Sequence, residues 1–326
     1  MRGRIVPAKQ NRSAARASVS AYRKTLAVAA QMDPLELFFT RFEFDRLLST
    51  IKDENAAVKK GSDKIRAKAA RKNSLGALSK LTDIVDGRRV IVPRPPLIVR
   101  LDEDGRRDAT DRIDVLWNEY LSTVSADRRV LLGRYSLVDV ALKVVGVGSV
   151  GTRCLIALFE SGDGEPLFLQ LKEATASVLE PYLAPSEHPQ AGQRVVTGQQ
   201  VIQAAPDAFL GWGRLTHSDR GSLGRADEAD IDFYFRQLWD GKFSATVEEM
   251  VPVGLERYAR WCGAALARAH ARSGDASMIS GYLGDDATFD KVVAAFAEAY
   301  ADRTLADHTE LVGAVEAGEI PIVRDL

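Results

Sequence analysis

Gly146-Val147-Gly148-Ser149-Val150-Gly151 stands between segments whose sequences are typical of β-strands. Directly before it, apolar residues alternate with polar or small ones, which is the period of a strand. Two further strand-like segments follow at 154–159 and 167–171, and the turn Ser161-Gly162-Asp163-Gly164 between them predicts a hairpin. Lys172 comes directly after the last of these strands. The sequence therefore predicts the order strand, glycine loop, strand, hairpin, strand, lysine.

The glycine segment fits two kinds of phosphate-binding loop, since Gly146, Gly148 and Gly151 match the spacing G-x-G-x-x-G. Glycine lets the backbone approach a phosphate closely, and its N–H groups can then point at the anion. A dinucleotide-binding unit of the Rossmann type needs a helix after the third glycine and an acidic residue about 20 residues on, where Glu173 is a candidate. The segment after Gly151 is short and rich in strand formers, so it leaves no room for that helix. A plain glycine-rich hairpin turn is a further alternative.

The position of Lys172 favours a kinase-type glycine loop. In that arrangement the glycines join two antiparallel strands and cover the phosphates, while a lysine on the third strand neutralises them. Lys172 emerges from a mostly apolar run, where a charge is costly to bury without an anionic partner. An edge-strand lysine that reaches solvent is the alternative, and Glu180 and Glu187 are the nearest downstream carboxylates to orient it. The residues expected to hold a nucleotide are Gly146, Gly148, Ser149, Gly151 and Lys172.

Residues for phosphoryl transfer are less evident. The reaction needs an Asp to position the attacking hydroxyl, an Asn for metal and a second, metal-binding Asp. The best candidate for the catalytic base is Asp275 in His270-Ala271-Arg272-Ser273-Gly274-Asp275, although no Asn follows at a suitable spacing. The same segment fits the end of a helix, with cations in the last turn and Gly274 as the cap. Asp285, Asp286 and Asp290 could bind a metal, but Asp285 and Asp286 look more like a loop before the last helix, and no residue is assigned to a metal.

Helical periodicity predicts helices on both sides of these strands. They are expected at 14–31, from Asp45 onwards, around 113–121, at 190–205, from Pro252 onwards and at 287–301. The buried face of the helix that starts at Pro252 is expected to comprise Leu255, Tyr258, Ala259, Cys262, Leu266 and Ala269. Short strands are expected at 89–92, 97–101 and 231–238, with a turn at Asp86-Gly87.

Composition limits the class of protein. The chain has 326 residues, is 46% hydrophobic and 27% charged, and can therefore bury a sizeable core. The net charge of −1 gives no sign of a polyanionic partner. Residues 1–32 are basic and free of acids, which fits a solvated helix or, alternatively, a transit peptide. The basic stretch 59–72 lacks interleaved aromatics, so a solvated face is expected there rather than a nucleic-acid site.

The cysteines, histidines and apolar runs exclude two further classes. Cys154 and Cys262 are expected to be buried free thiols in a reducing cytoplasm. Two cysteines and four scattered histidines make no recognisable zinc motif. Since no apolar run approaches the ~20 residues that span a bilayer, no membrane partner is expected.

Further segments make the sequence similar to the bacterial family called domain of unknown function 2252, over nearly the whole chain from about residue 14. The segments that carry the resemblance are 139–154 with the glycine loop, 167–174, 192–196, 209–212, 236–238 and 266–275. The family is placed among kinase-like proteins. The resemblance therefore implies an α+β, partial protein-kinase-like fold of the aminoglycoside-phosphotransferase type, with an antiparallel sheet in the nucleotide lobe and a helical remainder. It also implies ATP and Mg²⁺ as ligands.

The family looks like a kinase fold with its motifs in permuted order. Its G-D-x-H-x-x-N-type loop and Asp-rich segment lie before the region that this sequence covers. None of Gly162-Asp163, Gly274-Asp275 and Gly284-Asp285 is followed by that His and Asn. The resemblance thus implies nucleotide binding by an N-terminally truncated chain without its catalytic loop, for which a separate N-terminal segment or a homo-oligomer is an expected partner.

Three regions are expected along the chain: a helical region with short strands at 1–136, a nucleotide-binding lobe at 137–240 and a helical lobe at 241–326. The leading hypothesis is a cytoplasmic, ATP-binding, kinase-like protein that is a phosphotransferase only when a missing segment completes it. The first alternative is a non-catalytic module that binds a nucleotide or a protein partner. A Rossmann-type oxidoreductase ranks below both.

Overall fold

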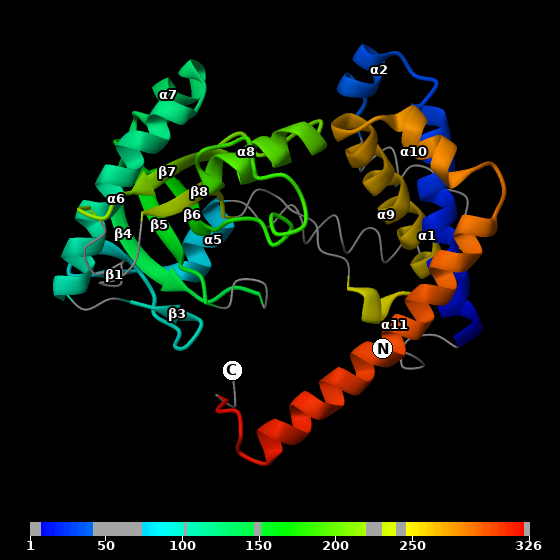
Figure 1. The fold of residues 1–326 in the computed structure, drawn as a ribbon. Coiled ribbons are helices and arrows are strands. Elements are labelled where there is room, and N and C mark those ends of the chain that lie inside the picture. The colour runs from blue at the N-terminus through cyan, green and yellow to red at the C-terminus, as the bar shows by residue number, and fades with distance from the viewer. Residues whose placement is uncertain are drawn as a thin grey trace. The chain divides into compact units, whose positions relative to one another are not determined.

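The computed structural model describes residues 8–41, 74–100, 103–146, 151–219, 230–238 and 246–322, which form two compact units (Figure 1). The sheet unit comprises residues 68–200 and 205–242. The helical unit comprises residues 1–67, 201–204 and 243–326. The region expected at 1–136 is thus shared between the two units. Within the described ranges, no helix is long and apolar enough to cross a membrane.

The sheet unit is built on an antiparallel sheet of six strands in the order β3-β4-β5-β6-β8-β7. These strands are β3 (Ile98–Val99), β4 (Tyr135–Lys143), β5 (Cys154–Ser161), β6 (Pro166–Ala174), β7 (Gly211–Leu215) and β8 (Ile231–Gln237). Because β4, β5 and β6 are neighbours in the sheet as well as in the sequence, the predicted strands around the glycine loop are confirmed. Gly164, with φ +80°, supplies the left-handed residue in the predicted β5–β6 turn.

One face of this sheet is covered by α6 (Glu103–Thr123), which is followed by the short helix α7 (Ala126–Leu132). The largest core cluster lies between α6 and the strands, and includes Ile113, Leu116, Tyr120, Leu155, Leu171, Phe233 and Phe235. The rings of Tyr120 and Phe235 stack with their centroids 4.3 Å apart. The Tyr120 hydroxyl donates a hydrogen bond to the carbonyl oxygen of Phe209 at 2.9 Å, so its polar end is satisfied.

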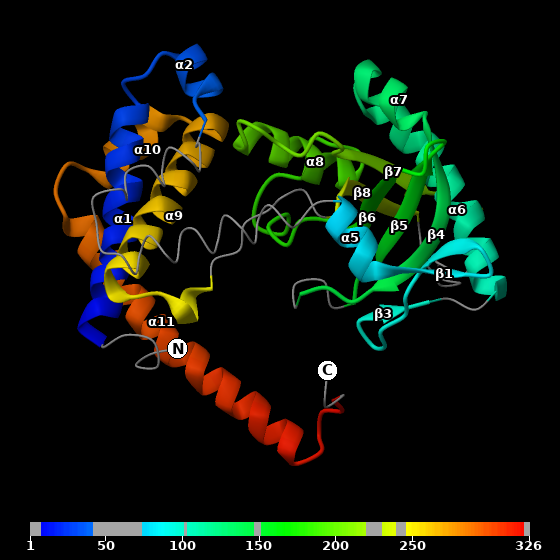
Figure 2. The ribbon, with the colours of Figure 1, turned by 180° about the vertical axis from the view of Figure 1, so that it is seen from behind.

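The other face carries α5 (Ser74–Leu81), seen in front of β6 in Figure 2. Its apolar residues share a second core cluster with Ile91, Ile98, Ala141, Ile156, Leu158 and Phe168. A two-stranded hairpin of β1 (Thr82–Val85) and β2 (Arg88–Ile91) follows α5 directly. Asp86 and Gly87 form its predicted turn, and both have positive φ angles, 51° and 75°. Between β6 and β7 the chain forms α8 (Ala191–Ile202).

The helical unit consists of helices from both ends of the chain. They are α1 (Ala8–Ala29), α2 (Pro34–Phe39), α9 (Pro252–Ser273), α10 (Ala276–Leu283) and α11 (Thr288–Glu316), and a short 3₁₀ turn, Val247–Glu249, precedes α9. A buried ion pair joins Arg23 of α1 to Asp290 of α11, with Nε and Oδ1 2.9 Å apart. The hydrogen bond from Arg23 lowers the pKa of Asp290. The expected helix from Asp45 and the basic stretch 59–72 lie outside the described residues.

The buried face of α9 differs from the prediction. Leu266 is 52% exposed and Cys262 is exposed, so the expectation of two buried thiols is wrong for Cys262. The residues that face the core are instead small ones: Gly263, Ala267 and Ala271. A Cβ atom at Gly263 would lie 2.0 Å from the Ser18 carbonyl oxygen, so α1 and α9 pack backbone to backbone there. The prediction followed the helical spacing of the apolar residues and left Gly263 out, whereas close helix packing places the smallest residues at the contact.

Candidate functional site

The two ends of the glycine loop are described, and they leave the backbone accessible. Gly146 follows β4 and Gly151 precedes β5, and both are exposed. A Cβ atom at either position would meet no atom within 4 Å. Gly151 has φ +82°, a conformation that glycine adopts at no steric cost. The other predicted loop residues, Gly148 and Ser149, lie outside the described part of the chain.

Lys172 lies on the sheet face opposite α6. In the register of the sheet it is paired with Cys154 of β5 on one side and with Tyr234 of β8 on the other. Side chains that are paired across strands point to the same face, while Leu171, the neighbour of Lys172, points into the core under α6. The Lys172 ammonium lies 6.0 Å from the centroid of the Tyr234 ring. The lysine is half-buried and lies within β6, two residues before the end of the strand.

The surroundings of Lys172 are polar and positive. Gln170, two residues earlier on the same face, donates a hydrogen bond from Nε2 to the Cys154 sulfur at 3.2 Å. Burial raises the pKa of the Cys154 thiol, and the nearby charges of Lys172 and Lys143 oppose that rise. Lys143 is the last residue of β4, so two lysines lie near the thiol at the end of the sheet from which the glycine loop extends. This arrangement can attract an anion to the end of the sheet.

None of the carboxylates in the described ranges pairs with Lys172. Glu173 pairs with Arg153, whose Nη1 lies 2.9 Å from Oε2. Of the two carboxylates considered from the sequence, Glu180 accepts a hydrogen bond from the backbone N–H of Ser177 and Glu187 is exposed. Helix α8 contains no acidic residue. The Lys172 ammonium therefore has an aromatic ring beside it and no counter-ion from these residues.

Helix α8 is held against β7 and β8 by contacts that sequence reasoning missed. Asp232 of β8 accepts hydrogen bonds from the backbone N–H of Ala191 at 2.6 Å and from Arg214 of β7. The buried amide of Gln190 donates to the Gly213 carbonyl oxygen at 2.9 Å. A Cβ atom at Gly192 would lie 2.3 Å from the Phe233 carbonyl oxygen, so only glycine allows this approach. These polar anchors fix the start of α8 on the sheet.

Asp275, the candidate catalytic base, lies in the helical unit and caps a helix. Its carboxylate accepts a hydrogen bond from the backbone N–H of Met278 at 2.9 Å, at the start of α10. Gly274 is the C-cap residue of α9, as the helix-end interpretation of this segment expects. The Nδ1 atom of His270 lies 2.8 Å from the Tyr22 hydroxyl. Among the described residues, no group of three or more His, Cys, Asp or Glu side chains is arranged to hold a metal ion.

The two cysteines are expected to differ in reactivity. Cys262 is exposed, whereas Cys154 is buried and its thiol has a raised pKa. The thiolate is the form that reacts. At neutral pH a thiol reagent should therefore modify Cys262 first, and the labelling rate of Cys154 should be lower by a factor of roughly ten or more. Cys262→Ser should remove the fast phase of labelling, and Cys154→Ser should remove the slow phase. In denaturant, the two cysteines of the wild-type chain should be labelled at equal rates. A fast phase that survives in Cys262→Ser would contradict the burial of Cys154.

The chain matches one protein family over almost its whole length. Residues 2–314 match the model of the family described as "Uncharacterized protein conserved in bacteria (DUF2252)". No curated protein and no solved structure matches the chain. A match over more than nine-tenths of the sequence confirms the resemblance found in the sequence segments. The chain therefore belongs to the DUF2252 family of proteins conserved in bacteria.

Proposed function

We propose that the sheet unit binds ATP with its Mg²⁺, with the glycine loop over the phosphates and Lys172 as the neutralising cation. The observation that carries this proposal is the half-buried Lys172 on β6, without a carboxylate partner among the described residues and beside the β5 end of the loop. A kinase-type loop needs a glycine connection between two antiparallel strands and a lysine on the third. β4, β5 and β6 supply this order.

The backbone near the loop supports phosphate binding of this kind over a dinucleotide-binding unit. Three residues after Gly151 the chain enters β5, an antiparallel strand, where a Rossmann-type unit needs a helix to receive the pyrophosphate. Gly151 in the left-handed region and the accessible backbone at Gly146 suit a loop that lies directly against an anion. An ATP γ-phosphate would supply the counter-ion that Lys172 does not find in the described ranges.

The proposal concerns binding and not phosphoryl transfer. An active kinase holds its lysine with a glutamate from the following helix, and α8 offers none. The carboxylate of Asp275 is used as a helix cap, which accounts for that residue without catalysis. A non-catalytic nucleotide-binding module therefore fits the described residues better than a complete phosphotransferase does.

Calorimetric titration with ATP and Mg²⁺ tests the proposal. Wild type should bind with a measurable Kd. Lys172→Met should raise the Kd at least roughly tenfold, since a charge-assisted hydrogen bond to phosphate is lost. Lys80→Met, which removes an exposed lysine of the same unit, is the matched control and should leave the Kd unchanged. Equal affinities of wild type and Lys172→Met would refute the role of Lys172. Binding of NADH without binding of ATP would support the dinucleotide alternative instead.

A further inference from the structure

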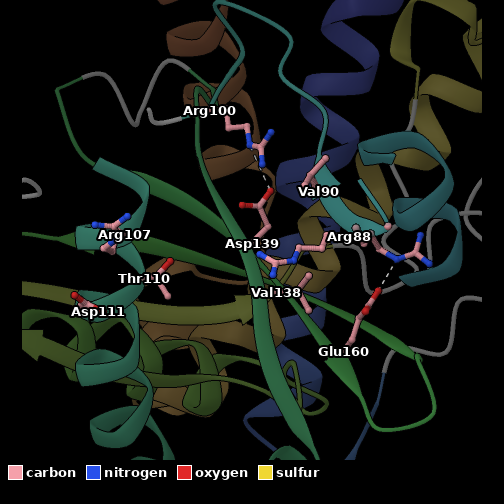
Figure 3. A pocket seen from close by; sticks show the side chains of 11 residues that line it. Arg88, Val90, Arg100, Arg107, Thr110, Asp111, Val138, Asp139 and Glu160 are labelled. Atoms are coloured by element: carbon pink, nitrogen blue, oxygen red, sulfur yellow. Dashed lines mark hydrogen bonds and ion pairs between the residues drawn. The ribbon is translucent and has the colours of Figure 1, made fainter. Parts of the chain in front are cut away.

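A second cleft of the sheet unit, here called the arginine cleft, lies between the β1–β2 hairpin, β4 and the start of α6 (Figure 3). Its volume is about 620 Å³. Arginines from β2, from the segment after β3 and from α6 line it, together with three acidic residues and a threonine. The polar lining comprises Arg88, Arg89, Arg100, Arg107, Thr110, Asp111, Asp139 and Glu160. The cleft lies away from the glycine loop, along the part of β4 that β3 does not pair with.

Local structure explains why these side chains meet. The turn at Asp86 and Gly87 reverses the chain, so that β2 starts with Arg88 and Arg89 at the mouth of the cleft. On α6, Arg107, Thr110 and Asp111 lie three and four positions apart, which places them on one face of the helix. Arg88 and Arg107 thus approach the cleft from two sides, one from a strand and one from a helix (Figure 3).

Two of the three acids in the cleft are already occupied. Glu160 pairs with Arg89 at 2.5 Å. Asp139 is buried and accepts a hydrogen bond from the backbone N–H of Ile91 at 2.7 Å. The guanidinium of Arg100 approaches Asp139 only to 3.8 Å, which is an ion pair without a hydrogen bond. The acids therefore leave donors of the arginines unused.

Arg100 carries a buried donor that finds no acceptor among the residues that the structure describes. Its Nε atom is buried and makes no hydrogen bond to any described atom. A buried donor on a charged group is costly to leave unsatisfied, and natural proteins rarely do so without a ligand, an ion or water nearby. Arg88 and Arg107 line the same cleft, and neither forms an ion pair with a residue in the described ranges. Three guanidinium groups thus offer donors to the same space.

We propose that the arginine cleft is a binding site for a small oxyanion, a phosphate or carboxylate group on a polar molecule. Guanidinium groups present paired N–H donors that match the oxygens of both groups, and Arg is the residue of choice where such recognition is needed. Arg88 and Arg107 supply the free charges, Arg100 the buried donor and Thr110 a hydroxyl. The site is independent of the proposed ATP site, because it uses none of the residues assigned to the nucleotide.

Asp111 allows a test in which one substitution should raise the affinity for the anion and others should lower it. It is an exposed acid that lines the same cleft, and no described cation pairs with it. A carboxylate in an oxyanion site repels the ligand, so Asp111→Asn should tighten binding roughly threefold, the effect of one screened unit charge at short range. Arg88→Gln and Arg107→Gln remove attraction instead and should each weaken binding roughly tenfold. A general loss of structure would not produce changes of opposite sign.

Calorimetry with inorganic phosphate, pyrophosphate and citrate at fixed ionic strength measures these affinities, and the comparison of the three separates phosphate from carboxylate ligands. All variants should also be prepared with Lys172→Met, so that phosphate bound at the proposed ATP site does not contribute. Arg134→Gln, which removes an exposed arginine of the same unit outside the cleft, is the matched control and should bind like wild type. Arg88→Lys keeps the charge without the paired donors and should lie between wild type and Arg88→Gln.

The proposal is supported if at least one of the three anions binds wild type saturably and the arginine and Asp111 variants change its affinity in opposite directions. It is overturned if none of the anions binds, if Arg88→Gln and Arg107→Gln bind as tightly as wild type, or if Arg134→Gln weakens binding as much as they do. A failure of ATP binding with intact citrate binding would reject the proposed nucleotide site and leave this one standing.

Discussion

Replacing Arg23 with methionine is expected to lower the free energy of unfolding of the helical unit by about 3–5 kcal/mol. Arg23 is 8% exposed and Asp290 only 2%, so the substitution leaves a buried carboxylate without its partner. Two hydrogen bonds to Asp290, at 2.9 and 3.0 Å, and one to the Asp285 carbonyl oxygen, at 2.8 Å, are lost together. Urea denaturation followed by circular dichroism measures the change.

The same pair of helices provides the control for Arg23. Arg12 of α1 pairs with Glu298 of α11 at 2.9 Å, but its side chain is 67% exposed. Because water screens this pair, Arg12→Met should leave the unfolding curve almost unchanged. The double variant Arg23→Met/Asp290→Leu removes both buried charges and should recover most of the lost stability. If Arg23→Met and Arg12→Met have equal effects, burial is not what makes the inner pair important.

Replacing Phe235 with alanine is expected to destabilise the sheet unit by about 3–5 kcal/mol, the usual cost of truncating a buried phenylalanine. Phe235 is fully buried and stacks on Tyr120, which lies between the sheet and α6. Its loss leaves a cavity where α6 contacts the strands. Hydrogen exchange read by mass spectrometry should show faster exchange in peptides of β6, β8 and α6.

Tyr182 is the matched control for Phe235, since it belongs to the same unit and is 84% exposed. Tyr182→Ala should change the free energy of unfolding by less than about 0.5 kcal/mol. Peptides of the helical unit should exchange at the wild-type rate in Phe235→Ala. Equal acceleration in both units would show that they do not unfold separately.

Much of the sheet was predictable because its signals are local. Alternation along β4, the strand formers of β5 and β6 and the glycine turn between them are all read within a few residues. Strand β7 was missed, since its two glycines, Gly211 and Gly213, resemble a loop. The structure gives their reason: Cβ atoms there would lie 2.6 Å from the Tyr120 ring and 3.2 Å from Leu116. This requirement comes from α6, more than 90 residues earlier in the chain, and no local pattern contains it.

The candidate sites show the same limit. Lys172 could be placed on its strand from the order of strands. That no described carboxylate lies beside it depends on tertiary contacts, since Glu173 forms its ion pair with Arg153 instead. The arginine cleft was missed because its lining comes from separate elements. One signal was available: Asp139 lies between Val138 and Val140 in an apolar strand, and a carboxylate in such a place needs a partner.

The packing of α1 on α9 also determines the order in which the protein can be assembled during synthesis. Helix α1 is translated before the sheet unit, yet the small-residue face of α9 that it needs is translated only after the entire sheet unit. At ordinary rates of chain elongation this delay is on the order of 10–40 s. The sheet unit can complete its folding in that time, while Leu26 and the Arg23 guanidinium still lack the neighbours that bury them. The nascent α1 segment therefore keeps an apolar residue and a charge, both buried in the folded protein, exposed to water until α9 and α11 are made.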